Sequence, residues 1–160
     1  RQEMAENQQK DQQLEEQLRK VRANLKSQID QGLANVEKVG DQILVQLSTQ
    51  VSFRSGFAEL EATFLPTLGA LGETISELGS KVTISGHTDN IPIAFSERFL
   101  SNWDLSAARA AAVADFLIQD NAVAENRIDV VGFADTKPIA SNTTPLGRSQ
   151  NRRIEILIDS

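Results

Sequence analysis

The sequence contains no cysteine, and this absence excludes two kinds of structural support. Disulfide bonds cannot form, and a metal site built from thiolates is impossible. Histidine is almost as scarce, since His87 is the only one. One imidazole without cysteine falls short of the three or four protein ligands that a zinc site needs. The sequence therefore predicts a protein without disulfides, metal or cofactor.

A long apolar run and an excess of basic residues are also missing. No stretch approaches the ~20 apolar residues that a membrane-spanning helix needs. Because the chain begins with Arg1, we expect a fragment whose upstream signal or membrane segment has been removed. The formal net charge is −6 at pH 7. This argues against nucleic acid as the main partner, because phosphate contacts normally require a basic face.

Polar and apolar residues are distributed unevenly along the chain. Residues 1–40 are rich in Gln, Glu, Lys and Arg, whereas apolar residues become dense after residue 42. This change predicts a polar helical leader over 1–40, followed by one domain over 41–160 that is long enough to enclose its own core.

The leader carries one narrow apolar stripe. Steps of four and three residues separate Leu14, Leu18, Val21 and Leu25, as in the seam of a coiled coil. Further steps continue the stripe to Val36, so we expect a helix up to Gly40. The spacing fits a seam between two copies of the chain or a helix packed on its own domain, and it does not decide between them.

Residues 41–160 alternate between strand and helix patterns. Apolar residues with a period of two predict strands near 43–47, 82–86, 128–133 and 154–158. Apolar residues at helical spacing predict a helix ending at Leu78 and a second helix, capped by Asn102 or Asp104, that extends to Phe116. The order βαβαββ predicts an α+β sandwich, in which a mixed sheet has its helices on one face and a long N-terminal helix precedes it.

Two features refine these elements. Pro66 is tolerated only in the first turn of a helix, so the first domain helix should begin near residues 63–65. Gly79 is suited to its C-terminal cap. Residues 135–147, rich in Pro, Ser, Asn and Thr, predict a loop.

The polar residues do not form a recognisable catalytic group. His87 and Asp89 project to the same side of an extended segment, but no Gly-x-Ser-x-Gly sequence supplies a nucleophile for a triad. Asp89 and Asp104 could form the carboxylate pair of a glycosidase, yet nothing in the sequence brings them together. We therefore expect no catalysis, and we interpret His87 as a structural residue hydrogen-bonded at a strand end.

Asp89 and Arg109 are better suited to binding a ligand. A guanidinium holds a carboxylate through two parallel hydrogen bonds, and an aspartate accepts protons from an ammonium. Opposed across a cleft, the two side chains can hold a zwitterion. The start of the helix near Asp104 adds backbone N–H groups that favour a carboxylate. The alternative from spacing alone is an internal Asp89–Arg109 salt bridge without a ligand.

Three motifs in order resemble the OmpA-like peptidoglycan-binding domain: 86–89 (Gly-His-Thr-Asp), 105–110 (Leu-Ser-Ala-Ala-Arg-Ala) and 151–155 (Asn-Arg-Arg-Ile-Glu). The resemblance covers about residues 42–159. It implies a non-catalytic anchor that binds the meso-diaminopimelate of the peptidoglycan stem peptide. The ligand-binding residues that it implies are Asp89, Arg109, supported by Arg152, and a wall formed by Ser55, Gly56, Thr88, Asn90 and Leu105.

A finer resemblance is to the B subunit of the flagellar motor stator, especially the sodium-driven type. It is carried by an insertion over 91–99, by 101–106 (Ser-Asn-Trp-Asp-Leu-Ser) and by 132–138 (Gly-Phe-Ala-Asp-Thr-Lys-Pro). Phe57 departs from it, because stator relatives often have a small polar residue there. Trp103 fits either an anchor that packs the long loop onto the domain or a contact for a partner.

The stator resemblance implies the periplasmic part of a single-pass inner-membrane protein. Its implied partners are peptidoglycan, a second copy in a homodimer, the channel-forming A subunit and periplasmic ring proteins of the motor. Similar domains, with a comparable Asn-Trp-x-Leu-Ser run, end the inner-membrane anchors of type VI secretion systems. Such an anchor, or another OmpA-like envelope protein, is the alternative within binding functions, and a cell-wall hydrolase is the alternative from another class.

Overall fold

The computed structural model describes residues 2–93 and 98–159. The helices are α1 (Gln2–Asn24), α2 (Lys26–Asp30), α3 (Thr49–Ser52), α4 (Leu65–Leu78), α5 (Asn102–Asn121) and α6 (Pro145–Asn151), with short 3₁₀ turns at Ala62–Phe64 and Glu125–Arg127. The strands are β1 (Ala34–Val39), β2 (Gln42–Ser48), β3 (Val82–His87), β4 (Ile128–Gly132) and β5 (Arg153–Ile158). In the part of the chain that is described, no helix is long and apolar enough to cross a membrane.

The strands form one five-stranded mixed sheet in the order β1-β2-β5-β3-β4. β3 and β4 pair in parallel, because α5 returns the chain to the same end of the sheet, and the other neighbours pair antiparallel. The last strand, β5, lies between β2 and β3. The predicted fold class is therefore confirmed: an α+β sandwich with a mixed sheet and a long N-terminal helix.

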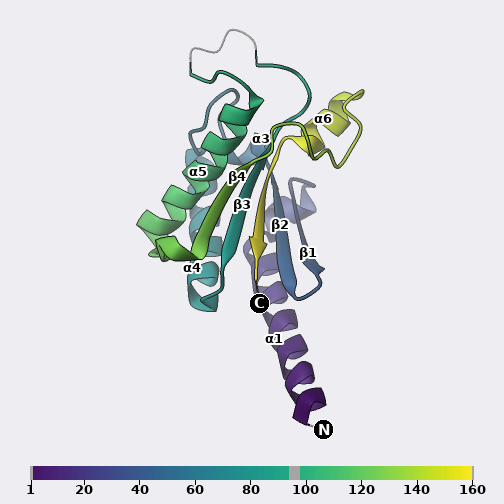
Figure 1. Cartoon of the computed structure of the whole chain (residues 1–160), viewed down its shortest axis with the longest axis vertical. Helices are drawn as coiled ribbons and strands as arrows, with labels where there is room; N and C mark the ends of the chain where they lie inside the picture. The colour runs from purple at the N-terminus through teal and green to yellow at the C-terminus, as the bar shows by residue number, and fades with distance from the viewer. Residues whose placement is uncertain (1, 94–97, 160) are drawn as a thin grey trace.

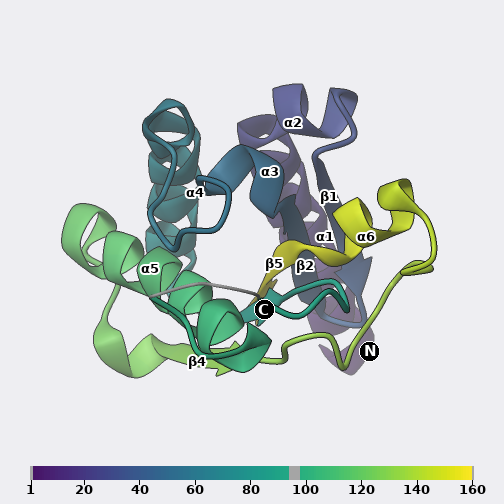
Figure 2. The ribbon, with the colours of Figure 1, turned by 90° about the horizontal axis from the view of Figure 1, so that it is seen from above.

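One face of the sheet is covered by α1, α4 and α5 (Figures 1 and 2). The inward side chains of β2 and β5 are almost fully buried beneath these helices. α4 begins with Pro66 in its first turn and ends at Gly79, whose φ of 69° is left-handed. Both features of α4 were predicted from the sequence.

The apolar stripe of the leader packs on its own domain. Leu14, Leu18, Val21 and Leu25 are each at most 4% exposed and belong to the hydrophobic core, and α1 contacts α4 and β1. Because the stripe is already buried within one chain, its interpretation as a coiled-coil seam between two copies is wrong. The division of the chain into residues 1–40 and 41–160 stays a prediction.

The prediction of a helix up to Gly40 is also wrong. The helical segments end at Asp30, and Gly32 follows with a φ of 75°. Ala34–Val39 then forms β1, which joins β2 through a two-residue turn at Gly40 and Asp41. Val36 fitted the helical spacing, but its pairing with Val45 buries it in a hairpin instead. Hairpin pairing thus outweighs the helical periodicity of these residues.

Two further boundaries also differ from prediction. α5 is capped by Ser101, whose Oγ accepts a hydrogen bond from the Asp104 N–H at 3.3 Å, and not by Asn102 or Asp104. The predicted loop over 135–147 ends in α6, a short helix capped by Thr144 with Pro145 in its first turn. Within the insertion at 91–99, residues 94–97 lie outside the described residues.

Two glycines let α5 approach the sheet closely. A Cβ added to Gly86 would lie 2.0 Å from the backbone oxygen of Ser106, and one added to Gly132 would lie 2.7 Å from the backbone nitrogen of Ala107. We predict that Gly86→Ala lowers the free energy of unfolding by at least about 2 kcal/mol, because the helix backbone must shift.

Urea denaturation of both proteins checks this prediction, with Gly69→Ala as the matched control. Gly69 lies inside α4, and a Cβ there meets nothing closer than the Phe116 ring at 4.0 Å. The control should gain about 0.5–1 kcal/mol, as alanine usually does inside a helix. Equal stability of Gly86→Ala and the wild type would contradict the close packing of α5 on β3.

Candidate functional site

Polar side chains converge on a cavity of about 340 Å³ at one end of the sheet. The carboxyl end of β3, the beginning of α5, the chain between α6 and β5, and α3 with the loop after it form its walls. These elements lie at the upper end of Figure 1, and the N-terminus lies at the lower end. The residues that line the cavity are Thr49, Gln50, Phe53, Ser55, Gly56, Thr88, Asp89, Ile91, Pro92, Ile93, Asn102, Leu105, Arg109 and Arg152.

Most of the predicted binding residues therefore share one cavity. Asn90 is the exception: it is exposed and does not belong to the lining. The structure adds Thr49, Gln50 and Phe53, which carry no motif and could not be identified from spacing. It also adds Asn102, whose amide donates a hydrogen bond to the Ile91 carbonyl at 3.0 Å and fixes the first residues of the long loop.

Arg109 is a buried cation on the wall of the cavity. It is 6% exposed, its Nε donates a hydrogen bond to the Phe57 carbonyl at 2.9 Å, and its Cζ lies 5.3 Å from the centre of the Phe53 ring. Burial, reinforced by repulsion from Arg152, lowers the pKa of Arg109 to about 10. Among the described residues no carboxylate lies within ion-pair distance of it. At neutral pH the described part of the cavity thus holds a charged guanidinium with no carboxylate of the described residues beside it.

Asp89 has a different partner from the one considered in the sequence. Its Oδ2 accepts a hydrogen bond from Arg152 Nη1 at 2.6 Å, and its Oδ1 accepts one from the Ile91 N–H at 3.0 Å. No Asp89–Arg109 bridge forms, so the alternative of an internal bridge between these two residues is wrong. Arg152 remains 41% exposed at its side chain, whereas the Asp89 carboxylate is held at the cavity wall.

The residues on either side of Arg152 form the framework behind it. Asn151 is fully buried, accepts hydrogen bonds from the Ile139 and Ala140 N–H groups, and donates one to the Ala140 carbonyl. Arg153 is also buried and donates to the Lys137 carbonyl at 2.8 Å. Within the Asn-Arg-Arg motif, the first and third residues therefore hold the preceding loop, and Arg152 lines the cavity.

His87 belongs to this framework rather than to the cavity lining. It is 3% exposed, and its ring stacks on Phe133 with the centroids 5.2 Å apart. Its Nε2 lies 3.2 Å from Glu155 Oε1, within ion-pair distance but not aligned for a hydrogen bond. The predicted burial at the strand end is correct, whereas the predicted hydrogen bond is not formed among the described residues.

Glu155 links β5 to its neighbours. Burial alone would raise the pKa of its carboxyl, but His87, Gln46 and Arg153 favour the charged form and together lower the pKa to about 2. Gln46 Nε2 donates to it at 2.7 Å and Arg153 Nε at 3.0 Å. A depressed folded-state pKa stabilises the fold above the unfolded-state pKa of about 4.3, and this contribution is lost as the pH falls toward 2.

We predict that Glu155→Gln destabilises the protein at pH 7 by up to about 3 kcal/mol, from the pKa difference alone. The deficit relative to the wild type should shrink as the pH falls from about 4.5 to 2, because the wild-type carboxylate becomes protonated there. Urea denaturation of the wild type and of Glu155→Gln across pH 2–7 measures this difference in the free energy of unfolding. A deficit that does not change with pH would show that the charge of Glu155 contributes nothing.

The cavity offers polar contacts of opposite charge to a ligand. Among the described residues, no group of three or more His, Asp and Glu side chains could hold a metal ion. Asp104, considered as a partner of Asp89 in a glycosidase, is exposed, accepts a hydrogen bond from the Leu100 N–H at 3.1 Å, and does not line the cavity. A guanidinium and a carboxylate that line one cavity offer complementary contacts to the two charges of a zwitterion.

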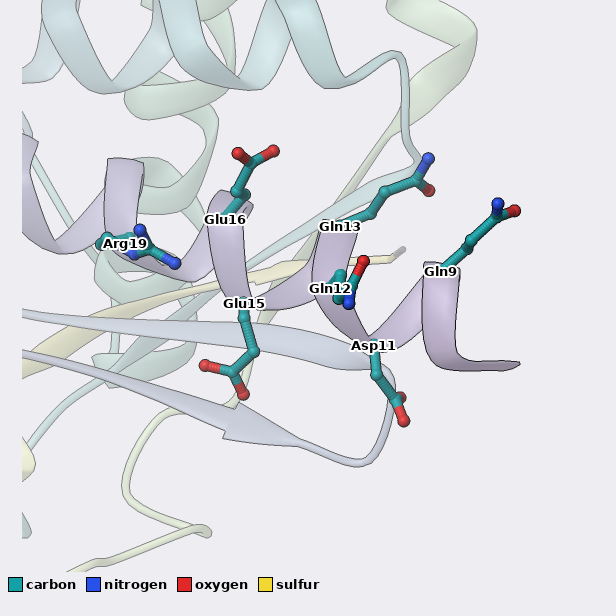
Figure 3. A pocket seen from close by; sticks show the side chains of 7 residues that line it. All are labelled: Gln9, Asp11, Gln12, Gln13, Glu15, Glu16 and Arg19. Atoms are coloured by element: carbon teal, nitrogen blue, oxygen red, sulfur yellow. The ribbon is translucent and has the colours of Figure 1, made fainter. Parts of the chain in front are cut away.

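A larger hollow, of about 670 Å³, lies along the exposed surface of α1, and its charged side chains are not arranged around a common point (Figure 3). Figure 3 shows its side chains pointing away from the helix in different directions. They do not converge on a common point, so a ligand would find no set of opposed contacts there. The lining residues are Gln9, Asp11, Gln12, Gln13, Glu15, Glu16 and Arg19.

Comparison with known proteins identifies similar chains. Motility protein B of Bacillus subtilis is 34% identical over 148 residues, which are 84% of this chain and 55% of the relative. Peptidoglycan-binding protein ArfA of Mycobacterium bovis is 48% identical over 80 residues, which are 50% of this chain and 23% of the relative. The chain thus spans about half or less of the length of these relatives.

A solved structure extends the similarity to three dimensions. The cell wall anchor of the T6SS from Pseudomonas aeruginosa superposes with a TM-score of 0.81 at 34% identity, covering 88% of this chain and 96% of that one. The model of the OmpA family matches residues 52–152, which include all the lining residues from Phe53 to Arg152. Since this match covers more than half of the sequence, the chain belongs to the OmpA family.

Proposed function

We propose that this chain is a non-catalytic periplasmic anchor that binds peptidoglycan through the diaminopimelate of the stem peptide. Diaminopimelate has a free carboxylate and a free ammonium on one carbon. In the proposed complex, Arg109 binds the carboxylate and Asp89 accepts hydrogen bonds from the ammonium. Arg152, paired with Asp89 at 2.6 Å, holds the aspartate in place, and its side chain stays partly exposed for contact with the ligand.

The uncompensated charge of Arg109 is the observation that carries this proposal. A buried ion is normally paired, because leaving one charge without a partner is strongly destabilising. Arg109 is held by the Phe57 carbonyl and is repelled by Arg152. An anion in the cavity would supply the missing partner. A plain anion would, however, face the Asp89 carboxylate, so a ligand that also carries a cation fits the wall better.

The position of the cavity supports an anchoring role. The cavity and the N-terminus lie at opposite ends of the molecule (Figure 1). α1 has 23 residues and is about 34 Å long at 1.5 Å per residue. If the chain is attached at its N-terminal side to a membrane segment, the cavity faces away from the membrane. This is the direction in which a wall-binding site should face.

We further propose that the anchored machine is the flagellar motor stator. The similarity to Motility protein B over 84% of this chain supports the assignment. The partners that we propose with it are a channel-forming A subunit, periplasmic ring proteins of the motor and a second copy of the chain in a homodimer. Because the stripe of α1 is buried within the chain, a homodimer would use another surface. The second candidate is a secretion-system anchor, favoured by the 34% identity to the cell wall anchor from Pseudomonas aeruginosa. A neighbouring gene for a four-helix channel subunit would favour the stator.

Sedimentation with purified sacculi tests the proposed function. The chain should sediment with sacculi whose stem peptides contain diaminopimelate and stay in solution with sacculi that have lysine at that position. Lysine lacks the second carboxylate, so Arg109 would remain without a counterion. Equal sedimentation with both kinds of sacculi would contradict binding through diaminopimelate, and no sedimentation with either would contradict wall binding altogether.

A further inference from the structure

A second group of charged side chains lies beside the cavity and is not explained by the Asp89–Arg109 site. The Cζ atoms of Arg54 and Arg98 lie over the ring of Phe57, at 4.8 and 4.2 Å from its centre. Glu59 lies close to both cations, with Oε2 3.5 Å from Arg54 Nη1 and Oε1 3.6 Å from Arg98 Nη1. We name Arg54, Phe57, Glu59 and Arg98 the rim cluster.

The rim cluster is continuous with the wall of the cavity. Ser55 and Gly56, which line the cavity, lie in the chain between Arg54 and Phe57. The carbonyl of Phe57 accepts the hydrogen bond from Arg109. Residues 54–57 therefore contribute to the cavity wall, hold Arg109 through the Phe57 carbonyl and carry the ring on which Arg54 and Arg98 lie, so the rim cluster adjoins the cavity.

The exposure and the restraint of its cations suit the rim cluster to binding an anion. Its four residues comprise two guanidinium groups, one carboxylate and one aromatic ring. The side chains of Arg54 and Arg98 are 57% and 58% exposed. Ion pairs as exposed as these contribute little to stability, so fold stability alone does not account for gathering two cations on one ring. The ring instead restricts both guanidinium groups and reduces the entropy that they lose when they bind.

We propose that the rim cluster is a second subsite, which binds another carboxylate of the same peptide. This inference rests on the proposed function, because the zwitterionic residue in the cavity brings the rest of the peptide to the rim. The ligand class is thus an acidic peptide: one zwitterionic side chain in the cavity and at least one further carboxylate outside it. Phe57, which departs from the small polar residue frequent in stator relatives, supplies the ring on which the two cations lie.

The expected contribution is modest and depends on salt. Exposed guanidinium–carboxylate pairs each change an equilibrium by less than about one power of ten. We therefore expect the second carboxylate to strengthen binding about three- to tenfold at low ionic strength. The gain should decrease in 0.5 M salt, where the screening length is well below 10 Å.

Calorimetry with two synthetic peptides tests the subsite. Both carry the same residue with a free ammonium and carboxylate on its side chain; in one the other carboxylates are free, and in the second they are amidated. The wild type should bind the free peptide about three to ten times more tightly. The double variant Arg54→Gln/Arg98→Gln should bind both peptides equally, with the affinity that the wild type has for the amidated one.

Two further variants separate the subsite from a general effect of charge or shape. Arg19→Gln removes a cation from the exposed surface of α1 and should leave the preference intact. Phe57→Leu keeps both cations but removes the ring, and it should lose part of the preference. If the wild type binds both peptides equally well, the subsite is wrong and the proposed function stands. If the wild type binds neither peptide, both proposals fail.

Discussion

Replacing Arg109 with glutamine should abolish the sedimentation of this chain with diaminopimelate-containing sacculi. The guanidinium is buried in the cavity and has no carboxylate partner among the described residues, so its most favourable partner is a ligand carboxylate. Loss of one member of a desolvated charge pair costs about 2–5 kcal/mol. This corresponds to an affinity decrease of roughly 30- to 5,000-fold.

The same variant could also lose binding because the Phe57 carbonyl loses its donor. A chemical change in the ligand separates the two causes. Amidating the zwitterionic carboxylate of a soluble peptide should weaken binding to the wild type but not to Arg109→Gln, because the contact is already missing there. Thermal unfolding checks the fold, and Arg19→Gln serves as the charge-matched control on α1. If amidation weakens binding to both proteins equally, Arg109 does not contact this carboxylate.

The sequence predicted the helices α4 and α5, the strands β2 to β5 and the layer arrangement, because each depends on a repeated apolar spacing. It failed where pairing with another strand decides the structure and where an element is too short to show a period. Val36 fits a helical stripe and a strand equally well, and only the partner strand β2 shows which one forms. α6 has too few apolar residues to produce a period, so its cap at Thr144 and Pro145 in its first turn were the local signals.

The binding site was predicted less completely than the fold. Asp89, Arg109 and Arg152 belong to motifs, and the structure places all three at one cavity. The partner of Asp89 could not be predicted, because Arg152 lies 63 residues away in the chain and reaches it only through the adjacency of β3 and β5. The pairing leaves Arg109 without a carboxylate partner among the described residues, which no local spacing could have indicated.

Replacing Asp89 with asparagine should change which ligand the cavity prefers. Asparagine has nearly the same shape, and its carbonyl can still accept the hydrogen bond that Ile91 N–H donates to Asp89 Oδ1. The variant loses the acceptor for the ligand ammonium and the counterion of Arg152. With both Arg109 and Arg152 uncompensated, the cavity then repels an ammonium and attracts a carboxylate more strongly than before.

Two peptides that differ only in the ammonium of the zwitterionic carbon measure this change. The wild type should bind the zwitterionic peptide roughly 30- to 5,000-fold more tightly than the deaminated one, if the Asp89–ammonium pair is desolvated. Asp89→Asn should lose this preference and bind the deaminated peptide at least as tightly as the wild type does. If Asp89 had only a structural role, Asp89→Asn would bind both peptides more weakly and to the same extent. Loss of the preference with undiminished binding of the deaminated peptide indicates that the carboxylate contacts the ammonium. A variant that retains the wild-type preference would contradict the zwitterion model, even if its affinity for sacculi were lower.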